Sequence, residues 1–302
     1  MGAGKGFYHF LAVMTVAIWG ATFVSTKILI NNGLSPNEIF FYRFLIAYAG
    51  IWIISHKRIF ADSFKDELML ACAGLFGGSL YFLTENTALG ITQASNVSFL
   101  LCGTPILTTV LTRMFFRDEK ISRMVYLGSA VALAGVALVV FDGATNLRIS
   151  PAGDLLTLAA ALSWGFYSIF IRKLENRYDT PFITRKVFFY GLVTILPTFI
   201  FNRPDPGLLF SSGVSVWLNL LFLAVMASLV CFMTWNVVLK HIGVVKSSSY
   251  LYLNPVITCI TSAIVLGEKI TPVAVTGALC IMTGVWLAGR QPARGREQVR
   301  RR

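Results

Sequence analysis

The sequence predicts an all-α integral membrane protein with ten transmembrane helices, arranged as two five-helix repeats of inverted topology. Three observations support this: an apolar composition, apolar runs of membrane-spanning length, and a motif that occurs twice. Of the 302 residues, 56% are hydrophobic and only 13% are charged, with a mean hydropathy of +0.70. Soluble domains carry about a quarter charged residues, so lipid is the expected solvent.

Ten apolar runs follow one another along the chain. Each is about 20 residues long, enough to cross a hydrocarbon core of roughly 30 Å. They lack the polar helix faces that a large soluble helical protein would need. The first run is too long for a cleaved signal peptide, and another span follows it directly. The runs cover residues 9–30, 37–55, 67–86, 94–115, 122–141, 154–171, 182–201, 214–238, 247–266 and 271–289.

A motif beside the fifth run recurs beside the tenth, and a second matched pair lies upstream. So many identical or similar residues in the same order indicate an internal duplication. The expected units are residues 1–146 and 147–289, followed by a basic cytoplasmic tail, 290–302. The repeated residues are Glu119-Lys120-Ile121-Ser122, Gly128, Gly135-Val136, Trp19-Gly20, Lys27 and Ser35-Pro36, with the second copies Glu268-Lys269-Ile270-Thr271, Gly277, Gly284-Val285, Trp164-Gly165, Arg172 and Thr180-Pro181.

The 26 lysines and arginines predict the orientation. With the N-terminus inside, 21 fall at cytoplasmic span ends or in the tail, and three, Arg148, Arg203 and Lys269, fall outside. This bias predicts a multi-pass protein of the cell inner (plasma) membrane with both termini cytoplasmic, and it explains the net charge of +12 without a nucleic-acid partner. Because five spans are an odd number, the second repeat is inverted. Inverted repeats are typical of secondary transporters, with the binding site near the midplane between the halves.

These features resemble the EamA family of the drug/metabolite transporter superfamily, over nearly the whole chain. The resemblance implies a bacterial inner-membrane secondary transporter, not an enzyme, that exports small metabolites such as amino acids by alternating access. Import of a similar solute, or an integral-membrane enzyme, are the alternatives. The resemblance rests on Trp19-Gly20, Ala88-Leu89, Thr92, Ala94-Ser95, Thr104-Pro105, the Glu119 to Val136 block, Trp164-Gly165, Asn254-Pro255 and the Glu268 to Val285 block.

Prolines interrupt the fourth and ninth runs at matching places, at Pro105 and Pro255. A proline removes an intrahelical hydrogen bond and kinks the helix. Paired breaks in two halves are a sequence signal for the central site of a transporter. The alternative is a static kink that serves packing.

Three ionisable residues, Lys27, Arg43 and Glu85, lie within consecutive spans. Charges in a membrane are costly unless they pair or face water. Arg43 is the deeper cation, and we expect it to bind a substrate carboxylate or to pair with Glu85. Lys27 contributes to an outer gate or extends to the interface. Glu85 is the candidate for proton coupling.

Polar and aromatic residues gather around the helix breaks. An aromatic ring in mid-membrane can line a cavity or face lipid, whereas an amide facing lipid would lack hydrogen bonds. The candidate cavity residues are Trp19, Arg43, Tyr81, Glu85, Asn86, Asn96, Trp164, Tyr167, Trp235, Asn236, Tyr250 and Asn254.

We expect no cofactor and no metal. The three histidines lack metal-ligand spacing, and the chain has no glycine-rich phosphate-binding loop. The five cysteines lie inside apolar runs without paired spacing. The expected partners are a small-molecule substrate, the lipid bilayer and protons, with the protein a monomer or homodimer.

Overall fold

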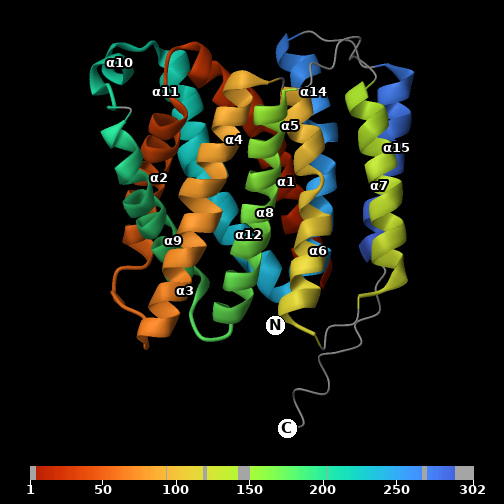
Figure 1. The fold of residues 1–302 in the computed structure, drawn as a ribbon, viewed down its shortest axis with the longest axis horizontal. Coiled ribbons are helices and arrows are strands. Elements are labelled where there is room, and N and C mark those ends of the chain that lie inside the picture. Colours follow the sequence, from red (N-terminus) through yellow and green to blue (C-terminus); the bar gives the residue numbers. More distant parts are fainter. Residues whose placement is uncertain are drawn as a thin grey trace.

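The computed structural model describes residues 5–92, 94–117, 121–141, 150–201, 203–266 and 271–289, and within these ranges the regular elements are all helical. Figure 1 shows them as an upright bundle. The α-helices are α1 Lys5–Asn31, α2 Pro36–Ile54, α3 Phe64–Gly74, α4 Leu80–Ile91, α5 Ala94–Leu101, α6 Thr104–Phe115, α7 Arg123–Phe141, α8 Pro151–Leu174, α9 Thr180–Ile195, α10 Pro206–Ser211, α11 Val214–Leu221, α12 Cys231–Ile242, α13 Val244–Ser249, α14 Asn254–Leu266 and α15 Pro272–Gly289.

Seven helical segments of the described chain are long and apolar enough to cross a membrane. The prediction of an all-helical, multi-pass membrane protein is confirmed. The other three predicted runs fall on α7, on α15, and on α13 with α14. The seven segments are Gly6–Asn31, Pro36–Ile54, Phe64–Ile91, Val97–Phe115, Pro151–Leu174, Thr180–Ile200 and Val214–Ile242.

Two of these segments contain π-helical turns, which the sequence analysis did not predict. Leu75–Ser79 joins α3 to α4, and Gly78 in it leaves the helical conformation with φ −117° and ψ −106°. Phe222–Val230 joins α11 to α12. Both segments are the third span of their predicted repeat. A π-helical turn changes the direction in which the following side chains point, and such turns are frequent at functional sites. These two spans are therefore candidates to contribute to the functional site.

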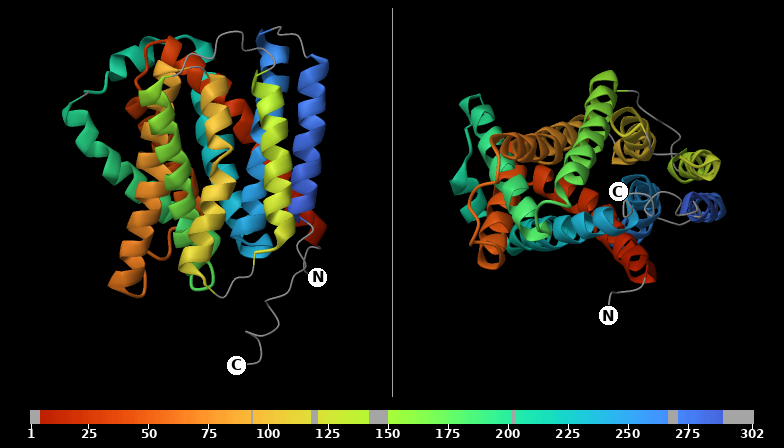
Figure 2. Two further views of the ribbon diagram at one scale, coloured as in Figure 1. Left: turned by 45° about the vertical axis from the view of Figure 1, so that its right-hand side comes forward. Right: turned by 90° about the horizontal axis from the view of Figure 1, so that it is seen from below.

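The duplicated glycines lie where α7 and α15 pack side by side, at one edge of the bundle (Figures 1 and 2). A Cβ atom on Gly128 would lie 2.5 Å from the carbonyl oxygen of Gly284, and one on Gly135 would lie 2.5 Å from that of Gly277. Any larger residue would push the helices apart. Each contact joins the first glycine of one copy to the second glycine of the other, so the two helices run antiparallel.

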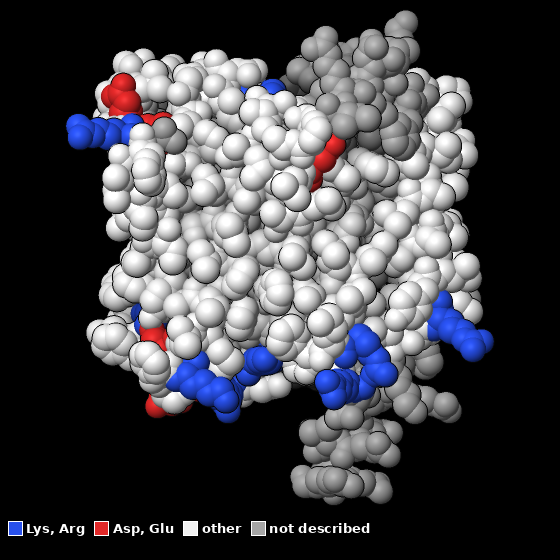
Figure 3. Space-filling view, in the orientation of Figure 1, with Lys and Arg blue, Asp and Glu red and all other residues white. Residues whose placement is uncertain are grey.

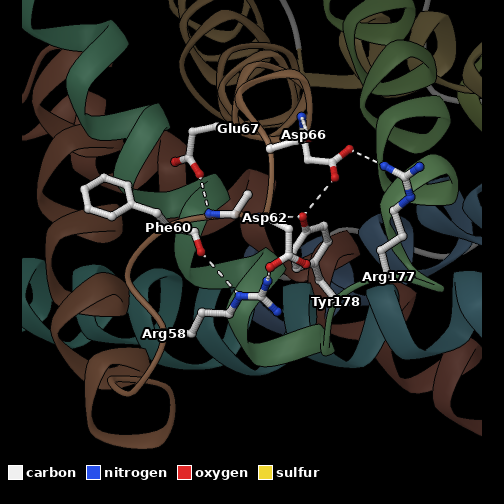
Figure 4. A network of polar contacts seen from close by, with 9 residues as sticks. Arg58, Phe60, Asp62, Asp66, Glu67, Arg177 and Tyr178 are labelled. Atoms are coloured by element: carbon white, nitrogen blue, oxygen red, sulfur yellow. Dashed lines mark hydrogen bonds and ion pairs between the residues drawn. The ribbon is translucent and has the colours of Figure 1, made fainter.

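Lysines and arginines gather at the end of the bundle where α1 begins and α15 ends (Figures 1 and 3). At this end a polar network joins the α2–α3 loop to the α8–α9 loop (Figure 4). Asp66 pairs with Arg177 and accepts a hydrogen bond of 2.9 Å from the Tyr178 hydroxyl. Burial, with the nearby carboxylates of Asp66 and Asp62, raises the pKa of Tyr178, so its hydroxyl keeps its proton.

Glu67 forms a second part of this network, toward α9. Its carboxylate accepts hydrogen bonds from Lys186, from the Tyr190 hydroxyl and, at 2.7 Å, from the backbone N–H of Ala61. The Lys186 side chain is only 6% exposed. A buried ammonium needs its counter-ion, so the Glu67–Lys186 pair fixes the start of α3 against α9.

We expect Glu67→Gln to destabilise the fold by about 3–5 kcal/mol, because it leaves the Lys186 ammonium buried without a carboxylate. Thermal unfolding in detergent should show a clear fall in Tm. Asp62→Asn is the matched control: it removes another carboxylate from the same polar region, but its side chain is 72% exposed and pairs with Arg58 at the surface. Equal Tm changes in the two variants would contradict the role given to Glu67.

Candidate functional site

A narrow cavity lies in the middle of the bundle, among α1, α2, α4, α8, α12 and the broken helices α5–α6 and α13–α14. Its volume is about 40 Å³, which is room for roughly three waters and too little for a metabolite. Its lining residues are Trp19, Thr22, Phe23, Arg43, Tyr81, Phe82, Glu85, Leu101, Thr104, Trp164, Phe232, Leu251 and Asn254.

Most of the cavity wall comes in pairs from equivalent positions of the duplicated sequence, about 150 residues apart. One member of each pair belongs to the first half of the chain and the other to the second half. The two halves thus meet at the cavity and contribute similar side chains to it. The pairs are Trp19 and Trp164, Phe82 and Phe232, Leu101 and Leu251, and Thr104 and Asn254.

Aromatic rings pack against one another along the wall. The ring centroids of Trp19 and Trp164 lie 5.2 Å apart at an interplanar angle of 89°, and those of Trp164 and Tyr81 lie 5.1 Å apart. The Trp19 indole N–H donates to the carbonyl of Ala227 at 2.9 Å, which fixes its ring. The Trp164 indole N–H is buried and, among the described residues, has no hydrogen-bond acceptor. It is a donor available to a bound molecule.

Two charged side chains lie in this aromatic cavity. Arg43 on α2 is 2% exposed, its Nε donates to the Ser228 hydroxyl at 2.9 Å, and its Cζ lies 4.3 Å from the centroid of the Phe82 ring. Glu85 on α4 is 7% exposed and accepts a hydrogen bond of 3.0 Å from the Tyr81 hydroxyl. Within the described chain, Arg43 and Glu85 do not form an ion pair with each other. Each charge thus remains available to a ligand.

Both proline positions adjoin the cavity. The fourth predicted run is interrupted between Leu101 and Thr104, and Pro105 lies in the first turn of α6. The ninth is interrupted by a 3₁₀ turn, Tyr250–Leu253, before Asn254 and Pro255 begin α14. The residue before each proline lines the cavity. The side-chain oxygen of Asn254 is buried and has no hydrogen-bond donor among the described residues.

Lys27 lies outside the cavity lining. Its ammonium donates to the carbonyl of Leu89 at 2.7 Å, near the end of α4. A cation there interacts favourably with the free carbonyls at a helix C-terminus. Among the three ionisable residues singled out from the sequence, the structure brings together Arg43 and Glu85.

Five other predicted residues lie near the cavity but do not line it. Asn236 accepts from the Tyr167 hydroxyl at 2.7 Å and donates to Thr184 at 3.0 Å, so both polar groups are used in packing α8, α9 and α12 together. The Trp235 ring lies behind Trp19, with centroids 5.1 Å apart.

Tyr250 and Asn86 are the remaining two of these five. The Tyr250 hydroxyl lies 2.6 Å from Nδ1 of His9. Asn86 donates to the carbonyl of Pro36 at 3.4 Å. The side chain of Asn96 lies outside the described residues. Mid-membrane polarity in the sequence therefore did not separate residues that line the cavity from residues that pack elsewhere in the bundle.

The sequence analysis missed the apolar part of the wall and one polar residue behind it. Phe82 and Phe232 carry no polar signal, although their equivalent positions in the two copies could have identified them. Ser228 was missed because it lies in the π-helical turn Phe222–Val230, whose altered register no simple helical periodicity reveals.

Comparison with known proteins is consistent with this geometry. The sequence model of the EamA-like transporter family matches the chain twice, over residues 6–141 and 151–290. This chain belongs to that family. The resemblance drawn from the sequence is thereby confirmed, and the relatives of this EamA-like protein indicate a transporter.

Relatives match over almost their whole lengths. A probable amino-acid metabolite efflux pump of Escherichia coli is 25% identical over 92% of this chain and 93% of that protein. A probable terminal-alkyne amino-acid exporter of Streptantibioticus cattleyicolor is 25% identical over 92% of each chain. An uncharacterized transporter of Bacillus subtilis, YyaM, is 29% identical over 89% of each.

A solved crystal structure shares the fold. It superposes with a TM-score of 0.74 over 94% of this chain and 97% of that chain, at 18% sequence identity. At this identity the likeness shows the architecture alone.

Proposed function

We propose that this EamA-like protein is a secondary transporter that exports small zwitterionic or anionic metabolites, above all amino acids, across the bacterial inner membrane by alternating access. The observation that carries the proposal is the central cavity. Its aromatic walls come from both halves of the chain, while its two charges, Arg43 and Glu85, come from one half. Relatives named as amino-acid efflux proteins favour export over import of a similar solute.

The proposed architecture is ten transmembrane helices in two inverted repeats, residues 1–146 and 147–289. The glycine contacts between α7 and α15 support it. If an in-plane two-fold axis exchanges the repeats, a contact of Gly128 with Gly284 requires an equivalent contact of Gly277 with Gly135, and both contacts are present. The paired cavity wall supports the same axis. Exchanging the conformations of the two repeats would turn a cavity open to one side into one open to the other.

The cavity chemistry supports an amino acid as substrate. The guanidinium of Arg43 offers two-pronged hydrogen bonding to a carboxylate. Glu85 and the faces of Trp19 and Trp164 suit an ammonium group. The remaining apolar wall suits an apolar side chain. Because the cavity in this structure is too small for a metabolite, the two halves have to separate before a metabolite enters.

The orientation is tested at two exposed described positions that the basic-residue bias places on opposite sides. In a background without native cysteines, Arg203→Cys should react with a membrane-impermeant maleimide in intact cells, because it precedes α10 on the expected outer side. Lys57→Cys, in the α2–α3 loop, should react only after permeabilisation. Labelling of Lys57→Cys in intact cells would invert the proposed topology.

The carboxylate role of Arg43 is tested by comparing an amino acid with its amide. In counterflow with proteoliposomes, Arg43→Ala should raise KM for L-leucine by about tenfold or more and change that for L-leucinamide much less, because only the acid loses a charged hydrogen-bonding partner. Lys27→Ala is the control, since it removes a cation that lies outside the cavity lining. Equal losses for acid and amide in Arg43→Ala would remove the carboxylate role.

Proton coupling is assigned to Glu85, the acidic residue of the cavity lining. A buried carboxyl that gains and loses a proton can link a pH gradient to the exchange between open states. We expect Glu85→Gln to transport substrate down its gradient but to lose any response to an imposed pH gradient, measured as substrate flux in proteoliposomes. Asp62→Asn, at the exposed end of the bundle, should keep the response. A pH-driven flux that survives in Glu85→Gln assigns coupling elsewhere.

A further inference from the structure

We propose that Ser228 and Phe82 are positioning residues that aim the guanidinium of Arg43 at a substrate carboxylate. This inference rests on the proposed function, because it concerns how the cavity recognises the substrate that the function requires. It assigns a role in selectivity to a serine on a π-helical turn that does not itself line the cavity.

Arg43 uses only one of its N–H donors within the described chain. A guanidinium carries five N–H groups in a rigid plane. One of them, at Nε, is committed to the Ser228 hydroxyl at 2.9 Å. In the part of the chain that the structure describes, the Nη1 and Nη2 atoms donate to no other residue, although Arg43 lines the cavity. Those four N–H groups are the ones left to a ligand, and together they suit one carboxylate in a two-pronged arrangement.

Two contacts hold the plane of the Arg43 guanidinium. The Arg43 Cζ lies 4.3 Å from the centroid of the Phe82 ring, within the range of a cation–π contact. Phe82 is itself held by Phe40 and Phe44, with centroids 5.6 Å and 5.5 Å away. The ring restricts the guanidinium from one face, and Ser228 holds its Nε. Together these two contacts leave the side chain little freedom to turn.

Ser228 belongs to the second half of the chain, whereas Arg43 belongs to the first. Ser228 is fully buried, and it lies inside the π-helical turn Phe222–Val230 of the α11–α12 span. The hydroxyl reaches from this second-half span to Arg43 on α2 in the first half. The contact therefore links the orientation of the charged group to the packing of the two halves.

The contact between Arg43 and Ser228 has no copy in the duplicated sequence. The repeat that aligns Ser35-Pro36 with Thr180-Pro181 places Phe188 at the position equivalent to Arg43. Phe188 is fully buried and packs against Phe44, with ring centroids 4.9 Å apart. The packing of the two halves alone therefore does not require a charged residue at the position of Arg43. Binding of a charged group of the substrate would require one.

The test compares Ser228→Ala with Ser228→Thr, which keeps a hydroxyl. The probes are L-leucine and L-leucinamide, assayed by counterflow in proteoliposomes. We expect Ser228→Ala to raise KM for L-leucine by about tenfold, the effect of losing one hydrogen bond to a charged group, and that for L-leucinamide by less than about twofold. Ser228→Thr should restore KM for the acid to within about twofold of the wild-type value.

Two further variants make the test specific. Ser248→Ala is the matched control, because Ser248 is also a fully buried serine but donates only to Val244 within its own helix, at 2.8 Å. It should keep the wild-type ratio of acid to amide. Phe82→Leu keeps apolar volume but removes the ring face, and it should shift the ratio in the same direction as Ser228→Ala. This second route keeps the inference testable if Ser228→Ala folds poorly.

The outcomes separate the inference from the proposed function. If Arg43→Ala loses the preference for the acid while Ser228→Ala and Phe82→Leu keep it, the positioning role is wrong and the carboxylate role of Arg43 stands. If Arg43→Ala itself keeps the preference, the carboxylate site of the proposed function fails and the inference fails with it. Equal losses for acid and amide in Ser228→Ala, without rescue by threonine, would show a packing role only.

Discussion

The constraint that shapes this molecule is that lipid cannot hydrogen-bond to a polypeptide backbone. Every N–H and C=O group within the hydrocarbon has to be satisfied inside the protein, so continuous helices are the rule and interruptions must be enclosed by other helices. The described interruptions follow this rule. Leu101 and Thr104, which flank the gap between α5 and α6, and Leu251 and Asn254, at the break between α13 and α14, line the central cavity, and the π-helical turn Phe222–Val230 holds Ser228 behind it. The breaks therefore lie at the site, while its two charges, Arg43 and Glu85, come from the regular helices α2 and α4.

The all-helical membrane class was predictable from the sequence, because helices that cross a membrane need long apolar runs. Six of the twelve predicted cavity residues lie in the lining: Trp19, Arg43, Tyr81, Glu85, Trp164 and Asn254. The prediction used the rule that polar side chains in mid-membrane need a protein environment, whereas an aromatic ring can line a cavity or face lipid. The same reasoning could not tell a cavity residue from one that is satisfied by a neighbour. Asn236 and Tyr167 hydrogen-bond to each other across two helices, and only tertiary structure shows that pairing. Ser228 was missed because a π-helical turn shifts the face on which it lies.

The cavity combines a symmetric wall with asymmetric charges. Trp19 and Trp164, or Phe82 and Phe232, give an apolar surface that is similar from either half. Arg43 and Glu85, on α2 and α4, break this symmetry. If the proposed function holds, the two charges would give a zwitterion one preferred orientation, and its charged groups would stay with the first half during an alternating-access exchange.

The polar network at the basic end of the bundle bears on the proposed exchange between conformations. Glu67 and Asp66, at the start of α3, are held by Lys186 on α9 and by Arg177 and Tyr178 in the α8–α9 loop. A movement that separates α3 from α9 has to break a buried ion pair, which costs several kcal/mol unless water or new partners replace it. The aromatic contacts around the central cavity are worth about 0.5–1.5 kcal/mol each beyond their buried area. Under the proposed alternating access, an opening at the basic end would therefore require water or new partners for the charges of Glu67 and Lys186, and a ligand could drive it only through a large difference in affinity between the two states.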